Sequence, residues 1–161
     1  MISIRRAEQK DMKGINKLLN QVLMVHHNGR PDLFKTNVKK YTDEELALII
    51  EDDTRPIFVA VDENNEVSGY VFCIFQQHIN NNILTDVRTL YIDDLCVDEN
   101  QRGMHIGRML YEYVVEYARK EKFYNLTLNV WSCNENAMKF YESCGLKPQK
   151  VGMEMILLDE V

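Results

Sequence analysis

The segment from Leu90 to Gly107 holds the groups best suited to ligand binding or catalysis. It reads as an apolar run, a turn, and a basic loop that opens a helical pattern. The first amides of a helix lack intrahelical partners and lie at the positive end of its dipole, so they attract anions. Arg102 and Arg108 add positive charge there, and Gly103 and Gly107 permit close backbone approach. The segment therefore predicts an anion site.

The loop does not match two common phosphate-binding patterns. The Gly-x-Gly-x-x-Gly spacing of dinucleotide-binding proteins is absent, and no Gly-Lys-Ser/Thr follows as in a P-loop. A second segment, Asn129 to Leu146, combines an apolar strand pattern, an Asn-rich turn and a short helical pattern that ends at Gly145. The two segments together indicate a protein family more specifically than either segment does alone.

Together, these segments resemble the GCN5-related N-acetyltransferase (GNAT) superfamily. In that family, an Arg/Gln-x-x-Gly-x-Gly/Ala loop grips the pyrophosphate of acetyl-coenzyme A, and residues 102–107 align with it in register. The family's Asn-x-x-Ala-x-x-Phe-Tyr-x-x-x-Gly-Phe/Leu block is matched by Asn134, Ala137, Phe140, Tyr141, Gly145 and Leu146. The resemblance implies acetyl-coenzyme A as cosubstrate and transfer of its acetyl group to a primary amine.

The resemblance also implies a set of cofactor-binding residues. The strand before the loop splays from its neighbour in this family, so the backbone of Leu95, Cys96 and Val97 is expected to hold the pantetheine arm. The remaining expected contacts are Arg102, Gly103, Met104, His105, Ile106, Gly107, Arg108 and Asn134. His105 stands where the family has glycine. We expect it to adopt a helical φ, with its amide still able to donate; whether its imidazole also contacts the cofactor stays open.

Three side chains are candidates for proton transfer. Tyr141 resembles the tyrosine that family members often use to protonate the departing thiolate, although it also falls on an apolar stripe. Asp93 and Asp94 are candidate bases, because an amine with a lysine-like pKa is almost wholly protonated at neutral pH. Neighbouring residues of a strand face opposite sides, so we expect at most one of the two to face the thioester. Either aspartate could instead bind the substrate's ammonium group.

Two adjacent histidines, His26 and His27, are candidate substrate-binding residues. In this family, the connection between the first two helices borders the acceptor pocket, and a histidine there could serve as a base. An ordinary structured loop explains these residues equally well. No metal site is expected, because the four cysteines form no Cys-x-x-Cys pair and lie at no zinc-ligand spacing. No partner that would stabilise a thiolate is evident, which favours direct transfer over an acetyl-cysteine intermediate.

Composition narrows the class of protein. A chain of 161 residues, 45% of them apolar, suggests one domain over residues 1–161. The net charge of −6 argues against nucleic-acid binding and is compatible with a cationic acceptor. No apolar run reaches the roughly 18 residues of a membrane span, and the first residues lack a secretory signal pattern. We therefore expect a cytoplasmic protein without membrane contact.

The hydrophobic periodicity changes several times along the chain. It predicts helices over 8–25, from Thr42 or Asp43 to 50, 106–117 and 137–144, and strands over 2–6, 57–61, 67–75, 84–97, 126–131 and 151–158. Residues 26–32 are expected to break the first helix. The strand–helix–strand unit from Leu90 to Trp131 implies a locally parallel pair. The predicted class is α/β (α+β): a mixed, mostly antiparallel sheet of about six to seven strands flanked by about four helices.

The expected function is that of an enzyme, an acetyl-coenzyme A-dependent N-acetyltransferase with direct transfer. The acceptor stays open between a small-molecule amine and a protein amino group. A catalytically silent acyl-coenzyme A-binding regulatory protein of the same fold is the rival, and the substituted glycine at His105 is its main support. A homodimer is left open, because family members often form dimers.

Overall fold

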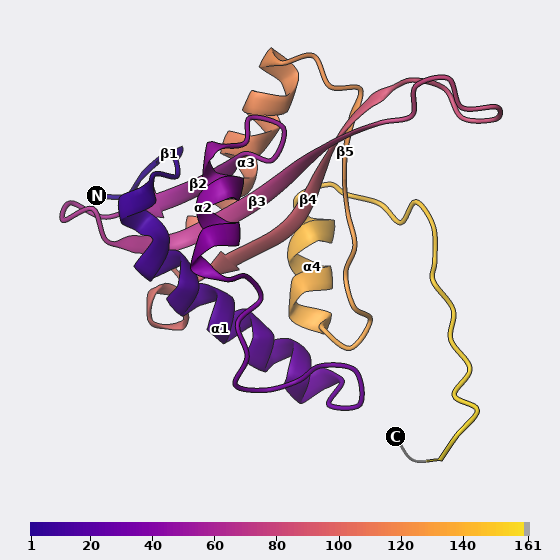
Figure 1. Ribbon diagram of the computed structural model, residues 1–161, viewed down its shortest axis with the longest axis horizontal. Coiled ribbons are helices and arrows are strands. Elements are labelled where there is room, and N and C mark those ends of the chain that lie inside the picture. The colour runs from indigo at the N-terminus through magenta and orange to yellow at the C-terminus, as the bar shows by residue number, and fades with distance from the viewer. Residues whose placement is uncertain (160–161) are drawn as a thin grey trace.

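The computed structural model describes residues 1–159, which form one five-stranded sheet and four α-helices (Figure 1). In chain order the elements are β1 (Ser3–Arg6), α1 (Met12–Gly29), α2 (Asp43–Glu51), β2 (Ile57–Val61), β3 (Val67–Gln77), β4 (Arg88–Val97), α3 (Ile106–Lys120), β5 (Asn125–Leu128) and α4 (Glu135–Ser143). The strands lie side by side in sequence order. All neighbours are antiparallel except β4 and β5, which are parallel. This confirms the mixed, mostly antiparallel sheet.

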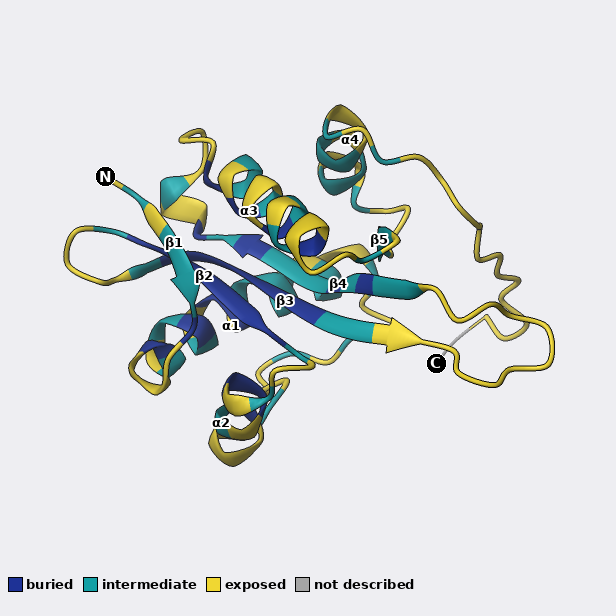
Figure 2. Ribbon diagram, turned by 90° about the horizontal axis from the view of Figure 1, so that it is seen from above, coloured by how far each residue is buried: buried dark blue, intermediate teal, exposed yellow. Residues whose placement is uncertain are grey.

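Helices cover both faces of the sheet (Figure 2). On one face, α1 and α2 bury residues such as Ile15, Leu18 and Leu46 against Val59 and Tyr70. On the other face, α3 packs its apolar stripe against alternate residues of the same strands, among them Phe58, Ala60, Val71, Leu90 and Ile92. All five residues of β2 are therefore buried. Each such apolar side chain contributes roughly 1.5–3 kcal/mol when it is fully buried.

The limits of several elements differ from those that the sequence predicts. The first helix continues to Gly29, so His26 and His27 lie in its last turn instead of breaking it. The fourth strand begins at Arg88 and the fifth ends at Leu128. Residues 151–158 form no strand, which leaves five strands instead of six to seven. Strand-forming residues need a neighbouring strand, and this segment lies beside none in the described part of its own chain.

A β-bulge interrupts the pairing of β3 with β4. Phe72 pairs with Asp94, whereas its neighbour Cys73 pairs with Ile92, so Asp93 is an extra residue in β4. The bulge shifts the alternation of side chains by one position. Ile92 therefore faces α3, while Cys96 faces α1. The bulge lies in the middle of β4, the strand that leads to the predicted cofactor loop.

None of the helices within residues 1–159 is long and apolar enough to span a membrane.

Candidate active site

The sheet opens between β4 and β5. These strands pair only from Thr89 with Asn125 to Ile92 with Leu128, where β5 ends. β4 continues to Val97. The edge of its residues 93–97 that faces away from β3 therefore has no strand partner among the described residues. An unpaired edge of this kind accepts an extended ligand through its backbone N–H and C=O groups. Leu95, Cys96 and Val97 lie on this edge.

The N-terminus of α3 lies directly after this edge and carries no side-chain cap. Its first helical hydrogen bond runs from the amide of Met109 to the carbonyl of His105, 3.0 Å away. The amides of residues 106–108 thus precede the ladder and have no intrahelical acceptor. Ile106 anchors this turn in the core with 1% of its surface exposed. The result is an anchored helix start whose amides can bind an anion.

His105 adopts a left-handed backbone conformation, with φ 59° and ψ 21°. The expectation of an ordinary helical φ is therefore wrong. The loop needs a left-handed residue to turn into α3, and that is the conformation in which a glycine would be unstrained. For a residue with a side chain, the left-handed conformation is less stable by roughly 1 kcal/mol. Gly103, with φ 87°, supplies a second left-handed position in the same loop.

Other residues of the predicted cofactor set connect α3 and α4. The guanidinium of Arg108 donates to the carbonyl and hydroxyl oxygens of Ser143, each 3.3 Å away. Asn134 caps α4 by accepting a hydrogen bond from the amide of Ala137 at 3.2 Å. A Cβ on Gly107 would lie 3.5 Å from both Val97 Cγ2 and Phe140 Cζ. The start of α3 is thereby held close to both β4 and α4.

Asp93 and Asp94 both act on one ammonium group, that of Lys40. Asp93 Oδ2 lies 3.3 Å from Lys40 Nζ. Burial lowers the pKa of Lys40, but the charges of Asp94 and Asp93 outweigh it, so the net shift is upward. The bulge at Asp93 breaks the alternation on which the expectation of opposite faces depends.

Asp94 lies beside a buried tyrosine. The hydroxyl of Tyr70, which is fully buried, donates to Asp94 Oδ2 at 2.7 Å. Burial raises the pKa of Asp94, although this hydrogen bond and the charge of Lys40 act in the opposite direction. A carboxylate with a raised pKa is a better proton acceptor at neutral pH than an ordinary aspartate.

Tyr141 lies on α4, half-buried beside the ring of Phe140, with 5.2 Å between ring centroids. Its pKa is raised, chiefly by burial and then by the negative charge of Asp94. The hydroxyl therefore keeps its proton at neutral pH and lies within electrostatic range of Asp94. The charge of Asp94, on β4, thus acts on Tyr141, on α4.

His26 and His27 lie in different surroundings. Burial lowers the pKa of His26, while the charges of Asp94 and Lys40 act on it in opposite directions. Its ring packs on Phe34 at 5.0 Å, and Phe34 meets Trp131 edge-on at 5.4 Å. His26 therefore lies within electrostatic range of Asp94 and Lys40. His27 Nδ1 instead lies 2.7 Å from the carbonyl oxygen of Phe34, a contact that holds the loop after α1.

Sequence reasoning missed Lys40, Tyr70 and Phe34. Lys40 stands in a run of charged and polar residues that resembles any solvated loop, and Tyr70 stands in an apolar strand. No local signal distinguishes these residues, because their importance comes from the tertiary contacts described above.

The family assignment rests on a sequence comparison. The model of the Acetyltransferase (GNAT) family matches residues 24–146, which include the β4 edge, the α3 loop and α4. The chain belongs to this family. Its curated relatives include the peptidyl-lysine N-acetyltransferase YjaB of Escherichia coli, 30% identical over 91% of this chain and 83% of that protein. A glucosamine 6-phosphate N-acetyltransferase of Arabidopsis thaliana is 23% identical over 93% of each chain. These relatives support an N-acetyltransferase.

Solved structures agree with this assignment. A mutant of the BH1408 protein of Bacillus halodurans has a TM-score of 0.92 and 31% identity, over 97% of this chain and 99% of that one. An aminoglycoside acetyltransferase from an uncultured soil sample, solved with sisomicin, has a TM-score of 0.73 at 19% identity, over 98% of this chain and 97% of that one. The second likeness concerns the fold alone.

The two buried cysteines of this GNAT chain, Cys73 and Cys96, are not poised as nucleophiles. Burial raises the pKa of Cys96 and of Cys73 to about 12, so both remain thiols at neutral pH. Cys133 is exposed and Cys144 is half-buried, and all four cysteines are free. In residues 1–159, no cluster of three or more His, Cys, Asp or Glu side chains could hold a metal ion.

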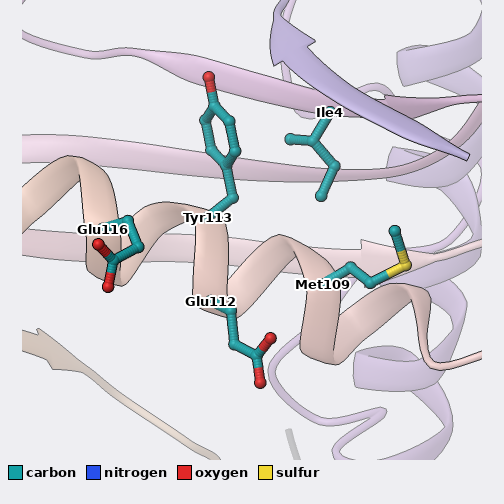
Figure 3. Close-up of a pocket in the computed structure, with 5 residues that line it drawn as sticks. All are labelled: Ile4, Met109, Glu112, Tyr113 and Glu116. Atoms are coloured by element: carbon teal, nitrogen blue, oxygen red, sulfur yellow. The ribbon is translucent and has the colours of Figure 1, made fainter.

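A surface recess of about 420 Å³ lies between β1 and α3 (Figure 3). It is lined by Ile4, Met109, Tyr113, Glu112 and Glu116, and the two glutamates point away from Ile4. The candidate active site is of another kind: a backbone edge next to a helix N-terminus. That shape suits a long, thin ligand that lies along the surface of the sheet.

Proposed function

We propose that this chain transfers an acetyl group directly from acetyl-coenzyme A to a primary amine of a cationic acceptor. One observation carries the proposal. An unpaired backbone edge begins where β4 leaves β5, an uncapped helix N-terminus follows it, and Asp94 on β4 acts electrostatically on Tyr141 of α4. Acetyl transfer from a thioester needs these four things: a grip on the pantetheine, a grip on the phosphates, a base and an acid.

The donor would lie along the sheet edge. The pantetheine arm would hydrogen-bond to the backbone of Leu95, Cys96 and Val97 in the manner of an added strand. Its pyrophosphate would accept hydrogen bonds from the amides of residues 106–108, with Arg102 supplying charge beside them. The left-handed turn at His105 supports this arrangement, because it leaves those amides at the open end of the helix.

The proton transfers can be assigned to two residues. The acceptor arrives as an ammonium ion and gives one proton to Asp94, directly or through a water molecule. The neutral nitrogen then attacks the thioester carbonyl carbon, and the C–S bond breaks as the C–N bond forms. Tyr141 gives its proton to the departing thiolate and regains one from the acylated nitrogen through solvent. The raised pKa of Asp94 suits the base, and Tyr141, which keeps its proton at neutral pH, has a proton to give.

The contact made by Lys40 supports a cationic acceptor. Its ammonium already lies 3.3 Å from Asp93 and within the field of Asp94. The carboxylate pair is therefore able to hold a primary ammonium group, and the net charge of −6 favours the approach of one. Because one relative acts on peptidyl-lysine and another on glucosamine 6-phosphate, the acceptor is a lysine side chain or a small amine.

The test is the release of coenzyme A thiol from acetyl-coenzyme A across a panel of amines, which includes lysine peptides, amino sugars and polyamines. We expect Asp94→Asn to lower kcat about 100-fold or more, as expected for a lost general base. Tyr141→Phe should lower kcat with little change in acetyl-coenzyme A affinity. Asp93→Asn is the matched control and should mainly raise the KM of the acceptor. Cofactor binding without turnover on any amine would favour the silent regulatory protein instead.

Lys40 allows a second check through the pH dependence of kcat/KM. Its positive charge lowers the pKa of Asp94, so Lys40→Met should raise that pKa. Asp94 must be ionised to accept a proton, and activity is lost as the pH falls through its pKa. The acid limb of the profile should therefore move to higher pH in Lys40→Met. Lys39→Met is the control, because Lys39 pairs with exposed Asp43 instead and should leave the limb in place.

A further inference from the structure

Lys40 brings a primary amine of the chain itself to the proposed base. It lies in the connection between α1 and α2, and its Nζ is 3.3 Å from Asp93 Oδ2. The charge of Asp94 acts on the same ammonium group. The side chain of Lys40 keeps 43% of its surface exposed, so a reactant from solution can reach it. Lys40 therefore meets the two carboxylates in the way that a bound acceptor amine would.

Tyr41 anchors the chain next to Lys40. Its ring stacks on Phe72, with 5.9 Å between the ring centroids, and packs against the buried cluster under α1 and α2. Phe72 in turn pairs with Asp94 across β3 and β4. The ammonium group of Lys40 also lies 5.4 Å from the centre of the Tyr41 ring. These contacts hold the amine near Asp94, which is the proximity that a group transfer requires.

The preceding residue, Lys39, has a different partner. Its Nζ lies 3.1 Å from Asp43 Oδ1 in the first turn of α2, and each of these two side chains keeps 63% of its surface exposed. Lys39 and Lys40 thus share one loop and one functional group. They differ in the carboxylates that they contact: an exposed aspartate at a helix start for Lys39, and the Asp93–Asp94 pair for Lys40. Lys39 is therefore an internal reference for the reactivity of an ordinary surface lysine.

We propose that the chain acetylates its own Lys40, so that this side chain is a covalent modification site. The observation that carries the proposal is the contact of the Lys40 ammonium group with the carboxylate pair at the active site. The inference rests on the proposed function, because it uses the same donor, acetyl-coenzyme A, and the same proton-transfer residues. It adds an acceptor that the chain carries with it and does not have to recruit from solution.

The modification needs no reactant besides acetyl-coenzyme A. The Lys40 ammonium gives one proton to Asp94, and the lone pair left on Nζ forms a C–N bond with the thioester carbonyl carbon. The C–S bond breaks, and its electron pair leaves with the sulfur. Tyr141 protonates this thiolate and regains a proton, through solvent, from the acylated nitrogen. Asp94 returns its proton to solvent, so the products are Nε-acetyl-Lys40, coenzyme A and one proton.

Acetylation changes the site at which it occurs. The amide carries no positive charge, so the ion pair between Lys40 and Asp93 is lost. An amide nitrogen is not a nucleophile for a second thioester, so each chain takes up one acetyl group at this position. The two carboxylates are then left without their internal ammonium group, and an ammonium group from outside the chain can take its place.

The experiment incubates the full-length chain with acetyl-coenzyme A that carries a ¹³C-labelled acetyl group. A protease that cleaves after acidic residues then releases a peptide with both lysines, and its fragmentation in the mass spectrometer gives the acetylation of each one. Unlabelled acetyl groups that the lysines already carry are counted with the labelled ones. We expect Lys40 to be acetylated about 100-fold faster than Lys39, because it is held beside a base. Its rate constant should be the same from about 1 to 100 μM chain, since the reaction is intramolecular.

Two variants test the mechanism of the labelling. Asp94→Asn removes the base and should lower the rate at Lys40 to that at Lys39, while the rate at Lys39 stays unchanged. Tyr141→Phe, on a different element, should also slow the labelling of Lys40 alone. Labelling of Lys40 that is equally fast in both variants would mean that the thioester reacts without help from the site. That result, or a rate constant that rises in proportion to the concentration of the chain, would overturn the proposal.

The amine panel is measured on the same samples, which separates this proposal from the proposed function. Turnover on an amine, with Lys40 acetylated no faster than Lys39, would overturn self-acetylation and leave acetyl transfer intact. Lys40 would then serve as a counter-ion of Asp93. Neither turnover nor acetylation of Lys40 would overturn both. Fast acetylation of Lys40 supports both proposals, even where no amine of the panel is turned over, because the acetyl group has reached a primary amine at the site.

Discussion

Two helices of this fold begin in opposite ways. The N-terminus of α2 is closed by a reciprocal cap: Thr42 accepts a hydrogen bond from the amide of Glu45, and Glu45 accepts one from the amide of Thr42. Its first turn also holds three acidic residues, which suit the positive end of the helix dipole. The N-terminus of α3 has no side-chain cap and no acidic residue in its first turn.

The difference separates a helix start made for stability from one made for a ligand. A cap satisfies amides that would otherwise stay unpaired. At α3 those amides are left open next to the free edge of β4, and Arg102 precedes them. The positive charge that α2 neutralises with its own carboxylates is left at α3 for an outside anion. Changes that exchange the two arrangements can test this comparison.

Giving α3 a cap of the α2 kind should have the largest effect. His105→Asp places a carboxylate at the helix start, where it would compete with a pyrophosphate for the same amides and repel it. We expect the Kd of coenzyme A, measured by calorimetry, to rise about 10- to 100-fold, which is about 1.4–2.8 kcal/mol. His105→Asn tolerates the left-handed conformation without the charge and should change Kd much less. Equal loss in both variants would mean that the amides of α3 do not bind the phosphates.

Removing the charge in front of α3 should have a smaller effect. Arg102→Ala should raise the Kd of coenzyme A about five- to tenfold, because one charge-assisted contact of roughly 1–1.5 kcal/mol is lost. The effect should shrink at high salt, since the residue lies at the surface. Arg119→Ala, in an exposed pair with Glu116 at the other end of α3, is the control. A loss that is equal for both arginines would indicate only a general effect of net charge.

Much of this arrangement is predictable from the sequence. The helical stripe that begins at Ile106 and the apolar run before it are strong periodic signals, so the strand, loop and helix around the α3 start are found correctly. The cap of α2 can also be predicted from neighbouring residues, because Thr42 is followed three residues later by Glu45. These features depend on residues that are close together in the chain.

The remaining features depend on distant contacts. The bulge at Asp93 arises because β4 must pair with β3 while burying Ile92 on one face and Cys96 on the other, and alternation alone does not reveal it. Residues 151–158 have the pattern of a strand, but their own chain holds no partner for them within the described residues. Lys40 reaches Asp93 across 53 positions of sequence. The sequence patterns of this chain therefore predict its helices and strands well, but they do not predict which strands and side chains contact one another.

Removing the cap of α2 tests whether this helix start serves stability alone. Thr42→Ala should lower the free energy of unfolding by about 1 kcal/mol, the usual value of an N-cap. Thr42→Ser keeps the oxygen and should retain most of that stability. Chemical denaturation measures both, and the Kd of coenzyme A should not change in either. A change in Kd as large as that of Arg102→Ala would mean that the two helix starts are not independent.

Replacing His105 by glycine should have the smallest effect on stability. The change removes a left-handed strain of roughly 1 kcal/mol, but glycine gains a similar amount of freedom in the unfolded chain. The two terms nearly cancel, so we expect the free energy of unfolding to move by less than about 0.5 kcal/mol. The Kd of coenzyme A then reports on the imidazole alone. An unchanged or lower Kd means that the backbone amides bind the anion without the ring, whereas a Kd raised several-fold means that the imidazole of His105 is itself part of the site.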